Sequence, residues 1–343
     1  MMSSRVSKIA ASLALSLLAL PALAQDTKIK FQLDWRFEGP SAFFLVAKSK
    51  GYFAHEKLDV TIDAGSGSAN AVNRVASGTY DMGFADVAAL MEFTANNPTA
   101  PSKPVAVMMV YNDTPAAIIA LKKSGIKSPA DLTGKKLGSP VFDAGRRAYP
   151  IFAKANGLDA AKATWVSMDP PLRETMLARG DVDAITGFTF TSQLNLNTRG
   201  IKDEDIAVLQ YPKHGVNLYG NAIIVSDAFA KQKPEAVKGF LRAFARAARD
   251  VMANPEAAVK TIKERDGLID EKLELRRLKM AIADAIATPN ARAEGFGQVS
   301  AARMALMASQ VSDTYNTKNR VDPKAVWNGS FLPAKAELSV FPK

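Results

Sequence analysis

Apolar and polar positions follow two alternating periods along the first hundred residues. Residues 29–33 alternate apolar and polar side chains, which predicts a strand with one apolar face. Apolar residues at helical spacing come next, and Gly51 is placed to end that helix in a left-handed cap. The same unit recurs with predicted strands over 58–62 and 80–86, each followed by a helical pattern. Short strands alternating with helices predict a parallel sheet with right-handed crossovers.

A second strand–helix set begins near residue 131. Before it, residues 104–111 form a continuous apolar strand, and residues 116–123 predict a strand that leaves the first lobe. Residues 217–226 predict the strand that returns. The chain is too long for one small core, so two lobes joined by two crossing strands are expected. The predicted division is lobe I over 25–115 and 219–343, and lobe II over 116–218.

The first residues carry the pattern of a secretory signal peptide. Arg5 and Lys8 precede an apolar run over 9–20, and Ala22-Leu23-Ala24 forms a small-x-small cleavage signal. The run is too short to cross a bilayer, which disfavours the alternative of a retained membrane anchor. The chain has no cysteine, and therefore no thiol for disulfides or lipid attachment. We expect cleavage after residue 24 and a soluble, periplasmic protein.

The charge of the chain is positive but evenly spread. Lys and Arg number 44 against 34 Asp and Glu, a formal net charge of +10. These residues are mixed along the sequence without a basic run, which is typical of a solvated surface. The pattern lacks the basic footprint of a nucleic-acid-binding protein. We expect a monomer with no nucleic-acid partner.

A turn of small residues follows the second predicted strand. In open parallel sheets, ligands bind beyond the carboxyl ends of the strands, near helix N-termini. The turn GSGSAN, residues 65–70, has two glycines that permit close backbone approach, and Ser66 and Ser68 offer short polar side chains. It matches neither a dinucleotide fingerprint nor a phosphate loop. An anionic or hydrogen-bonding ligand and a simple helix N-cap explain it equally well.

Two adjacent arginines, Arg146 and Arg147, stand at the start of a predicted helix in the second lobe. A cation at a helix N-terminus opposes the helix dipole, so a compensating group is expected. A bound carboxylate or sulfonate would compensate through bidentate hydrogen bonds. An internal salt bridge with Asp143 or Asp169 would do so as well.

Aromatic residues gather in the loops that follow strands, namely at Trp35, Phe37, Phe142, Phe188 and Tyr219. Ligand sites are mostly apolar with a few placed polar groups, which this arrangement fits. Packing at the edge of the core is the alternative, and it suits Phe37 better than Trp35. Trp35 stands among charged residues just where an apolar alternation ends, so we expect it to contact a ligand.

Candidate catalytic residues are few. The two histidines, His55 and His214, lie in polar loop contexts. Without cysteine a His/Cys metal set is excluded, and a Ser-His-Asp arrangement would need one of these two histidines. A metal site with oxygen ligands only is not excluded by the composition, although no pair of carboxylates in the sequence indicates one. We expect no enzymatic activity, no cofactor and no metal.

Three stretches resemble a known family: LDWRFEGPSAFFLVAKSKGYFAHEKLDVTI, GSGSANAVNRVASGTYDMGFAD and SPADLTGKKLGSP. They are similar to the nitrate/sulfonate/taurine-type substrate-binding proteins of ABC transporters, which share a superfamily with the pyrimidine synthase of yeast thiamine biosynthesis. LYGNAIIVSDAFAKQKPEAVKGFLRAF and SFLP fit as well, so the resemblance covers nearly all of the mature chain.

The resemblance implies an α/β, two-lobed periplasmic binding protein of type II, each lobe a mostly parallel sheet flanked by helices. Such a protein encloses a small-molecule ligand by hinge closure, which requires a higher affinity for the closed form. It hands the ligand to an ABC permease and its ATPase at the inner membrane. Carried over by position, the implied ligand-binding residues are Trp35, Ser66, Ser68, Asp86, Phe142, Arg146, Gly187, Phe188 and Tyr219.

The sequence also departs from its pyrimidine-binding relatives. Their loop after LDW carries an Asn-His pair, where this chain has Pro40 and Ser41. The synthase also has a cysteine-rich iron-site segment, which a chain without cysteine does not supply. The first hypothesis is therefore a binding protein for a small organic anion such as a sulfonate, taurine or a carboxylate, with or without an aromatic portion. The alternatives are binding of a thiamine-pyrimidine-type heterocycle, a pyrimidine-synthase type enzyme, and a sensor domain that uses the same pocket.

Overall fold

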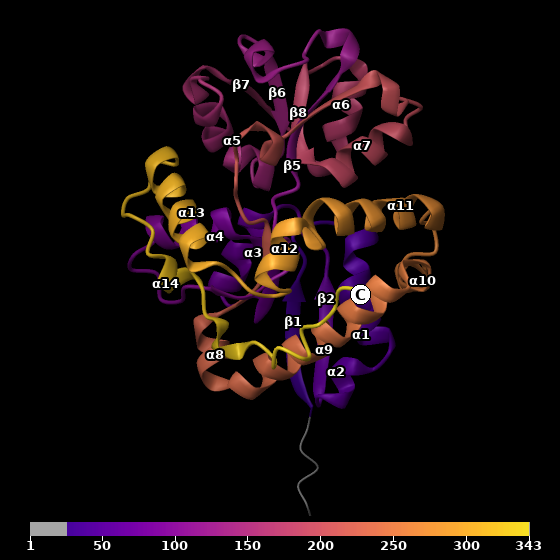
Figure 1. Cartoon of the computed structure of the whole chain (residues 1–343), viewed down its shortest axis with the longest axis vertical. Coiled ribbons are helices and arrows are strands. Elements are labelled where there is room, and N and C mark those ends of the chain that lie inside the picture. The colour runs from indigo at the N-terminus through magenta and orange to yellow at the C-terminus, as the bar shows by residue number, and fades with distance from the viewer. Residues whose placement is uncertain (1–25, 343) are drawn as a thin grey trace, which may run out of the picture.

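The computed structural model describes residues 26–342, which form two lobes, each built on one five-stranded sheet. In Figure 1 the lobe that contains β5 to β8 lies above the lobe that contains β1 and β2. The predicted signal peptide, residues 1–24, lies outside the described residues. Within residues 26–342, no helix combines the length and the apolar character that crossing a bilayer requires.

The lower sheet has the strand order β2-β1-β3-β10-β4. β1 pairs in parallel with β2 and β3, whereas β10 is antiparallel to both β3 and β4. Four of its five strands therefore run in one direction, with β10 inserted against them. The strands are β1 (Thr27–Gln32), β2 (Leu58–Asp63), β3 (Met82–Asp86), β4 (Val105–Met109) and β10 (Asn221–Val225).

The upper sheet repeats this plan with the order β7-β6-β8-β5-β9, in which β5 is the antiparallel strand. The predicted α/β fold with a mostly parallel sheet in each lobe is therefore confirmed. The strands are β5 (Ala116–Leu121), β6 (Lys136–Ser139), β7 (Thr164–Ser167), β8 (Ala184–Phe188) and β9 (Ile206–Gln210).

The inserted strands are apolar on both faces because helices cover both sides of each sheet. In β5, Ile118 packs into the core shared with α5 (Ala144–Ala155), while Ile119 packs into the core beside α6 (Arg173–Arg179) and α7 (Thr189–Asn197). In the same way, Ile223 and Ile224 of β10 face opposite sides of the lower sheet. The continuous apolar run predicts this double burial.

Helices from distant parts of the chain cover the lower sheet. α1 and α9 pack on one face, where Phe44 lies 4.8 Å from Phe244 between ring centroids. α3, α4 and α13 pack on the other face. The helices of this lobe are α1 (Ala42–Ser49), α2 (Tyr52–His55), α3 (Ser68–Ala76), α4 (Val87–Asn96), α8 (Asp227–Gln232), α9 (Pro234–Ala253), α10 (Pro255–Arg265), α11 (Glu271–Ala281), α12 (Pro289–Glu294), α13 (Ala301–Thr314) and α14 (Pro323–Val326).

The chain passes from the lower sheet to the upper one between β4 and β5, and it returns between β9 and β10. Each crossing runs directly into the antiparallel strand of the sheet that it enters. The lobe boundaries near residues 115 and 218 stay predictions. α11 belongs to the C-terminal part of the chain, yet it packs against α7 of the upper lobe and lies at the boundary between the lobes (Figure 1).

Candidate functional site

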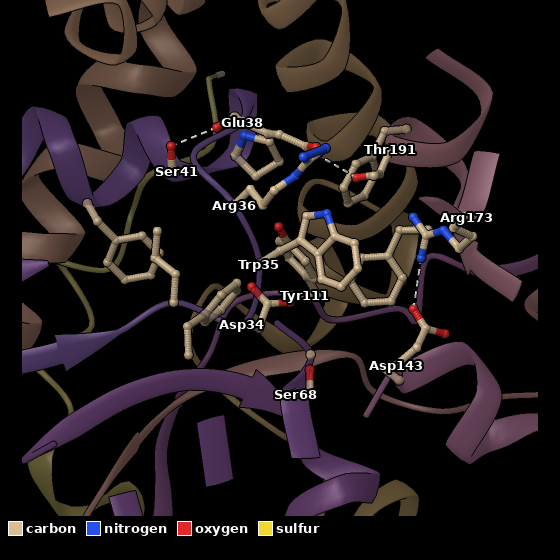
Figure 2. Close-up of a pocket in the computed structure, with 18 residues that line it drawn as sticks. Asp34, Trp35, Arg36, Glu38, Ser41, Ser68, Tyr111, Asp143, Arg173 and Thr191 are labelled. Carbon is tan, nitrogen blue, oxygen red and sulfur yellow. Dashed lines mark hydrogen bonds and ion pairs between the residues drawn. The ribbon is translucent and has the colours of Figure 1, made fainter. Parts of the chain in front are cut away.

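A cavity lies between the two lobes, beyond the carboxyl end of β1 (Figure 2). The lower lobe supplies the loop after β1 and the turn after β2, and the upper lobe supplies the first residues of α5, α6 and α7. This is the edge at which open α/β sheets bind ligands. The lining residues are Leu33, Asp34, Trp35, Arg36, Glu38, Pro40, Ser41, Phe44, Gly67, Ser68, Phe84, Tyr111, Asp143, Ala144, Arg173, Phe188, Phe190 and Thr191.

Trp35 and Arg173 meet across the cavity from opposite lobes. The Arg173 guanidinium carbon lies 4.9 Å from the centroid of the Trp35 ring, within the range of a cation–π contact. In Figure 2 the indole of Trp35 stands near the middle of the site, with Arg173 beside it. Trp35 thus lines the cavity, and one side of its ring is covered by the Arg173 guanidinium; its contact with a ligand stays a prediction.

The charge of Arg173 is balanced within the protein. Its Nη1 donates to Asp143 Oδ2 at 3.0 Å, and its Nε donates to Glu174 Oε1 at 2.8 Å. All three side chains are buried. Burial alone would lower the pKa of Arg173, but Glu174 and Asp143 outweigh burial and raise that pKa. A cation held between two carboxylates offers little net positive charge to an anionic ligand.

Asp34 follows β1 and points its carboxyl group into the site. Its Oδ2 accepts a hydrogen bond from Asn221 Nδ2 of β10 at 2.7 Å. Burial raises the pKa of Asp34 to about 7, and the negative charges of Glu38 and Asp143 add to the rise, whereas the bond from Asn221 opposes it. A carboxyl group with a pKa near neutrality exchanges its proton easily at physiological pH.

Aromatic rings form a continuous row along the cavity and join the two lobes. In the lower lobe Phe84 lies 5.3 Å from Phe44 and 5.1 Å from Tyr111, between ring centroids. Tyr111 continues the row into the upper lobe, at 6.2 Å from Phe188 and 6.0 Å from Phe190. Edge-to-face rings at these distances make favourable contacts and leave flat surfaces for a planar ligand.

Polar contacts hold the lobes together beside the cavity. Thr191 of α7 donates to Glu38 Oε2 at 2.8 Å, and Thr189 donates to Asp284 Oδ2 at 2.7 Å. Arg277 of α11 is fully buried and donates to the carbonyl oxygen of Phe190 at 2.8 Å. These bonds connect the loop that carries Trp35 and the helix α11 to the start of α7, so the lobes are closed on each other.

Three of the residues predicted for the site line the cavity: Trp35, Ser68 and Phe188. The hydroxyl of Ser68 and the indole Nε1 of Trp35 are both buried, and neither has a hydrogen-bond partner within residues 26–342. A buried polar group without a partner is costly, so both atoms indicate a place for a ligand or a water molecule.

The turn after β2 is held by its neighbours. Gly67 N donates to the carbonyl oxygen of Asp34 at 2.7 Å, and Ala69 N donates to that of Phe142 at 3.4 Å. Gly67 has a φ of +130°, and a Cβ atom there would collide with the Phe142 backbone from the opposite lobe. The first turn of α3 is therefore partly occupied by the upper lobe, and Ser68 is the residue of this turn whose side chain faces the cavity.

Arg146 and Phe142 lie near the cavity without lining it. The Arg146 guanidinium lies over the Trp165 ring at 4.7 Å, and its Nη1 donates to the carbonyl oxygen of Ser139 at 3.0 Å. Its partner along the chain, Arg147, pairs with Glu92. Groups of the protein itself therefore bind both guanidinium groups. Arg147 has a carboxylate partner, whereas Arg146 has a carbonyl oxygen and forms no salt bridge with Asp143 or Asp169. As ligand contacts, Arg146 and Phe142 stay predictions.

The remaining predicted residues, Ser66, Asp86, Gly187 and Tyr219, also lie outside the cavity lining. Asp86 caps α4 by accepting from Ala88 N at 2.9 Å. Gly187 lies so close to Arg173 that a Cβ atom would come within 3.0 Å of its guanidinium carbon. Tyr219 donates to Glu294 Oε2 at 2.6 Å in the lower lobe.

Several lining residues were not predicted from the sequence, among them Asp34, Glu38, Asp143, Arg173 and Thr191. Arg173 carries the same signal that singled out Arg146, because it opens a helix after a strand of the second lobe. Asp34 precedes Trp35 at the end of a predicted strand, so its position carried a signal as well. Glu38 lies in the same strand-following loop, but its hydrogen bond with Thr191 joins distant segments, and the sequence gave no signal for that pairing.

Comparisons with known proteins identify relatives along most of the chain. A synthase of 4-amino-5-hydroxymethyl-2-methylpyrimidine phosphate from Aspergillus parasiticus is 29% identical over 241 residues, covering 67% of this chain and 68% of the relative. The riboflavin-binding protein RibY of Chloroflexus aurantiacus is 28% identical over 219 residues, covering 63% of this chain and 60% of the relative.

The fold is shared with a solved sulfonate-binding protein. The alkanesulfonate-binding protein SsuA from Xanthomonas axonopodis pv. citri, bound to MOPS, superposes with a TM-score of 0.68 at 17% identity, covering 89% of this chain and 99% of that one. The family model described as NMT1/THI5 like matches residues 40–258, well over half of the sequence. The chain belongs to the NMT1/THI5-like family.

Proposed function

We propose that this protein is the periplasmic solute-binding component of an ABC importer, and that it captures a small planar ligand between its lobes. The observation that supports the proposal most directly is the position of the cavity, which takes its lining from both lobes. Closure brings Trp35, Arg173 and Phe188 together, so a ligand held there contacts both lobes at once. Contacts made only in the closed form are what allow a ligand to favour closure.

The lining favours an aromatic nitrogen heterocycle over the organic anion that was the first hypothesis from the sequence. Aromatic rings supply flat surfaces, and the buried cation Arg173 is already paired with Asp143 and Glu174. Two relatives agree with this choice, since a pyrimidine phosphate synthase and a riboflavin-binding protein both handle nitrogen heterocycles according to their names. The organic anion, a sulfonate, taurine or a carboxylate, stays a prediction that the same experiment tests.

We propose binding without catalysis. Relatives named as synthases belong to the same family, but the chain has no cysteine to supply the iron-site segment of the yeast enzyme. Pro40 and Ser41 occupy the positions of the Asn-His pair, and both line the cavity. Release of a pyrimidine product by the purified protein with iron and pyridoxal phosphate would overturn this part of the proposal.

The experiment is a thermal-shift panel on the protein that lacks residues 1–24. The panel contains cytosine, 4-amino-2-methylpyrimidine, riboflavin, benzenesulfonate, taurine and nitrate, because a ligand that binds only the folded state raises the melting temperature. We expect an aromatic heterocycle to raise it and to make the protein more compact in small-angle X-ray scattering. If only taurine or benzenesulfonate raised the melting temperature, the ligand would belong to the organic anions, as the sequence first suggested. No shift with any member, and no change in scattering, would contradict solute capture as proposed.

A further inference from the structure

We propose that Asp34, Ser68 and the indole N–H of Trp35 form a recognition set for an amidine-type edge. Such an edge is an aromatic ring that carries an amino group next to a ring nitrogen, or an amidinium attached to the ring. Asp34 accepts hydrogen bonds from its N–H groups, and Trp35 and Ser68 bind its remaining polar positions. The inference rests on the proposed function, since it names the chemistry by which the same cavity would choose its ligand.

Asp34 is placed to accept hydrogen bonds from a ligand. Within residues 26–342 the side chain that donates to its carboxyl group is Asn221, which reaches Oδ2, and the carboxyl group also lines the cavity. In the view of Figure 2 the carboxyl group appears between Trp35 and Ser68, facing the interior of the cavity. A carboxylate matches two adjacent N–H groups in a bidentate arrangement, as it does with arginine.

The unpartnered atoms specify further features of the ligand. The indole Nε1 of Trp35 is a donor only, so it needs an acceptor on the ligand or a water molecule. The Ser68 hydroxyl both donates and accepts; the residue is 1% exposed, and the hydroxyl has no partner within the described residues. A purely aromatic hydrocarbon would leave all of these groups unsatisfied. A nitrogen heterocycle with donors and acceptors on neighbouring atoms satisfies them together.

The charges around the set disfavour an anion. Three carboxyl groups line the cavity, those of Asp34, Glu38 and Asp143. Arg173 offsets Asp143, and Arg277 Nη1 lies 3.5 Å from Glu38 Oε2, so within residues 26–342 Asp34 is the lining carboxyl group that has no ion pair. An anionic head group beside Asp34 would meet like charge in a buried site, where such repulsion is strong. A neutral or cationic edge meets an acceptor instead.

The inference carries a pH dependence. The groups that face Asp34 are Asn221 on β10, Glu38 on its own loop, Asp143 at the start of α5, Asp86 at the end of β3 and Tyr111 after β4. Burial raises the pKa of Asp34 to about 7, so its carboxylate form gains population as the pH rises through neutrality. A permanently cationic amidine should therefore bind more tightly at pH 8 than at pH 6, whereas an isosteric neutral amide should be much less affected.

The test uses four planar probes of nearly equal size: benzamidine, 2-aminopyridine, benzamide and benzoate. Isothermal titration calorimetry on the wild-type protein at pH 8 should give the order benzamidine, 2-aminopyridine, benzamide, benzoate. Charge-assisted hydrogen bonds are about twice as strong as neutral ones, so we expect benzamidine to exceed benzamide by on the order of tenfold. The pH profile between 6 and 8 is measured with benzamidine and benzamide as a pair.

Asp34→Asn is the matching variant, since it keeps the size of the side chain and removes the charge. It should weaken benzamidine about tenfold or more, change benzamide little and abolish the pH dependence. Asp86→Asn is the control, because Asp86 is a buried carboxyl group whose pKa is also raised to about 7 and which does not line the cavity. The wild-type probe order and pH profile test the inference even if Asp34→Asn folds poorly.

The outcomes separate this inference from the proposed function. Tighter binding of benzoate than of benzamidine, or a benzamidine affinity that Asp34→Asn leaves unchanged, would overturn the role of Asp34 and leave solute capture standing. Failure of all four probes to bind would also overturn the inference, and the thermal-shift panel would then decide the proposed function separately. Equal effects of Asp34→Asn and Asp86→Asn on benzamidine would show a general effect of charge removal, which contradicts a recognition role.

Discussion

An aspartate stands at the carboxyl end of β1 and another at that of β3, and the surroundings of the two carboxyl groups differ: Asp34 is partly exposed and Asp86 is buried. Asp34 follows β1 and Asp86 ends β3, and burial raises the pKa of each to about 7. The Oδ1 of Asp86 accepts from the backbone N–H groups of Ala88 and Ala89, at 2.9 and 3.3 Å. Asp34 has one side-chain donor, Asn221, and otherwise faces the cavity.

The difference arises from the segment that connects each strand to its helix. α4 begins at Val87, directly after Asp86, so the free N–H groups of its first turn lie within reach of that carboxyl group. After β1 a loop intervenes, and α1 begins only at Ala42. Asp34 does not directly precede the helix that follows its strand, so its carboxyl group does not cap that helix and is available to Asn221 and to a ligand. The spacing between strand and helix decides whether a strand-end carboxylate is structural or available for a ligand.

The largest expected effect comes from removing the ring beside Asp34. Trp35→Ala should weaken the ligand found in the thermal-shift panel by at least about thirtyfold, since buried aromatic anchors contribute about 2 kcal/mol or more. The loss of stability should be small, because Trp35 lies in a loop and packs on Arg173 rather than in the core. Calorimetric affinity and urea unfolding of the same preparation measure the two effects.

Phe37→Ala is the control for Trp35→Ala. Phe37 lies in the same loop and packs against the core of the lower lobe, so its loss should reduce stability more than affinity. A large loss of stability with unchanged affinity in Trp35→Ala would place Trp35 with the core residues and remove the β1 end from the ligand site.

Substitutions of Asp86, at the end of β3, should reduce stability and leave ligand affinity unchanged, which is the reverse of the effect expected for Trp35→Ala. Asp86→Ala removes the cap of α4 and should lower the free energy of unfolding by about 1 kcal/mol, with ligand affinity unchanged within about twofold. Asp86→Asn keeps an acceptor oxygen for Ala88 N and should recover most of the loss. Urea titrations of the three proteins at one pH provide the comparison. A tenfold loss of affinity in Asp86→Asn would return Asp86 to the ligand contacts predicted from the sequence.

The two strand ends also show what the sequence is able to predict. The period-two pattern identified β1 and β2, and the apolar runs identified the buried strands, because backbone period and burial are local properties. Trp35 and Ser68 were predicted as ligand contacts because ligand sites follow strand ends; both line the cavity, and the ligand contact itself stays a prediction.

The rest of the site depends on pairs of residues that are distant in the sequence. Arg173 meets Asp143 across 30 residues, and Thr191 meets Glu38 across 153. A local pattern contains no signal for such pairings, since even where one residue stands out, as Arg173 does at the start of a helix, its sequence context does not identify the partner. Arg146 shows the converse, because it carries a local signal for a ligand and is bound internally to Ser139.

Both strand ends should contribute to the pH dependence of stability in the ligand-free protein. A carboxyl group whose pKa is raised binds more protons when folded, so its contribution to stability is lost as the pH rises from about 4 to about 7. Asp203, whose pKa is lowered by hydrogen bonds from Gln193 and Asn197, acts below this window. We therefore expect the melting temperature to fall between pH 5 and pH 8, by roughly 2–4 °C for each kcal/mol lost.

Two variants separate the contributions of Asp34 and Asp86 to the pH dependence of the melting temperature. Asp34→Asn and Asp86→Asn should each flatten the profile, and the double variant should flatten it most, since it removes both groups with a raised pKa. Calorimetry at four pH values without ligand gives the profile. A melting temperature that rises from pH 5 to pH 8 would contradict the raised pKa values of both carboxyl groups.

The smallest expected effect concerns Arg146, which has the local signal of a ligand contact but lies over Trp165 outside the cavity lining. Arg146→Gln should change affinity by less than about twofold, as substitutions away from a site do. Arg147→Gln is the matched control, because Arg147 pairs with Glu92 and also lies outside the lining. If Arg146→Gln weakened an anionic ligand tenfold while Arg147→Gln did not, the ligand would reach the upper lobe beyond Phe142, and recognition would centre on a cation there rather than on the carboxyl group that follows β1.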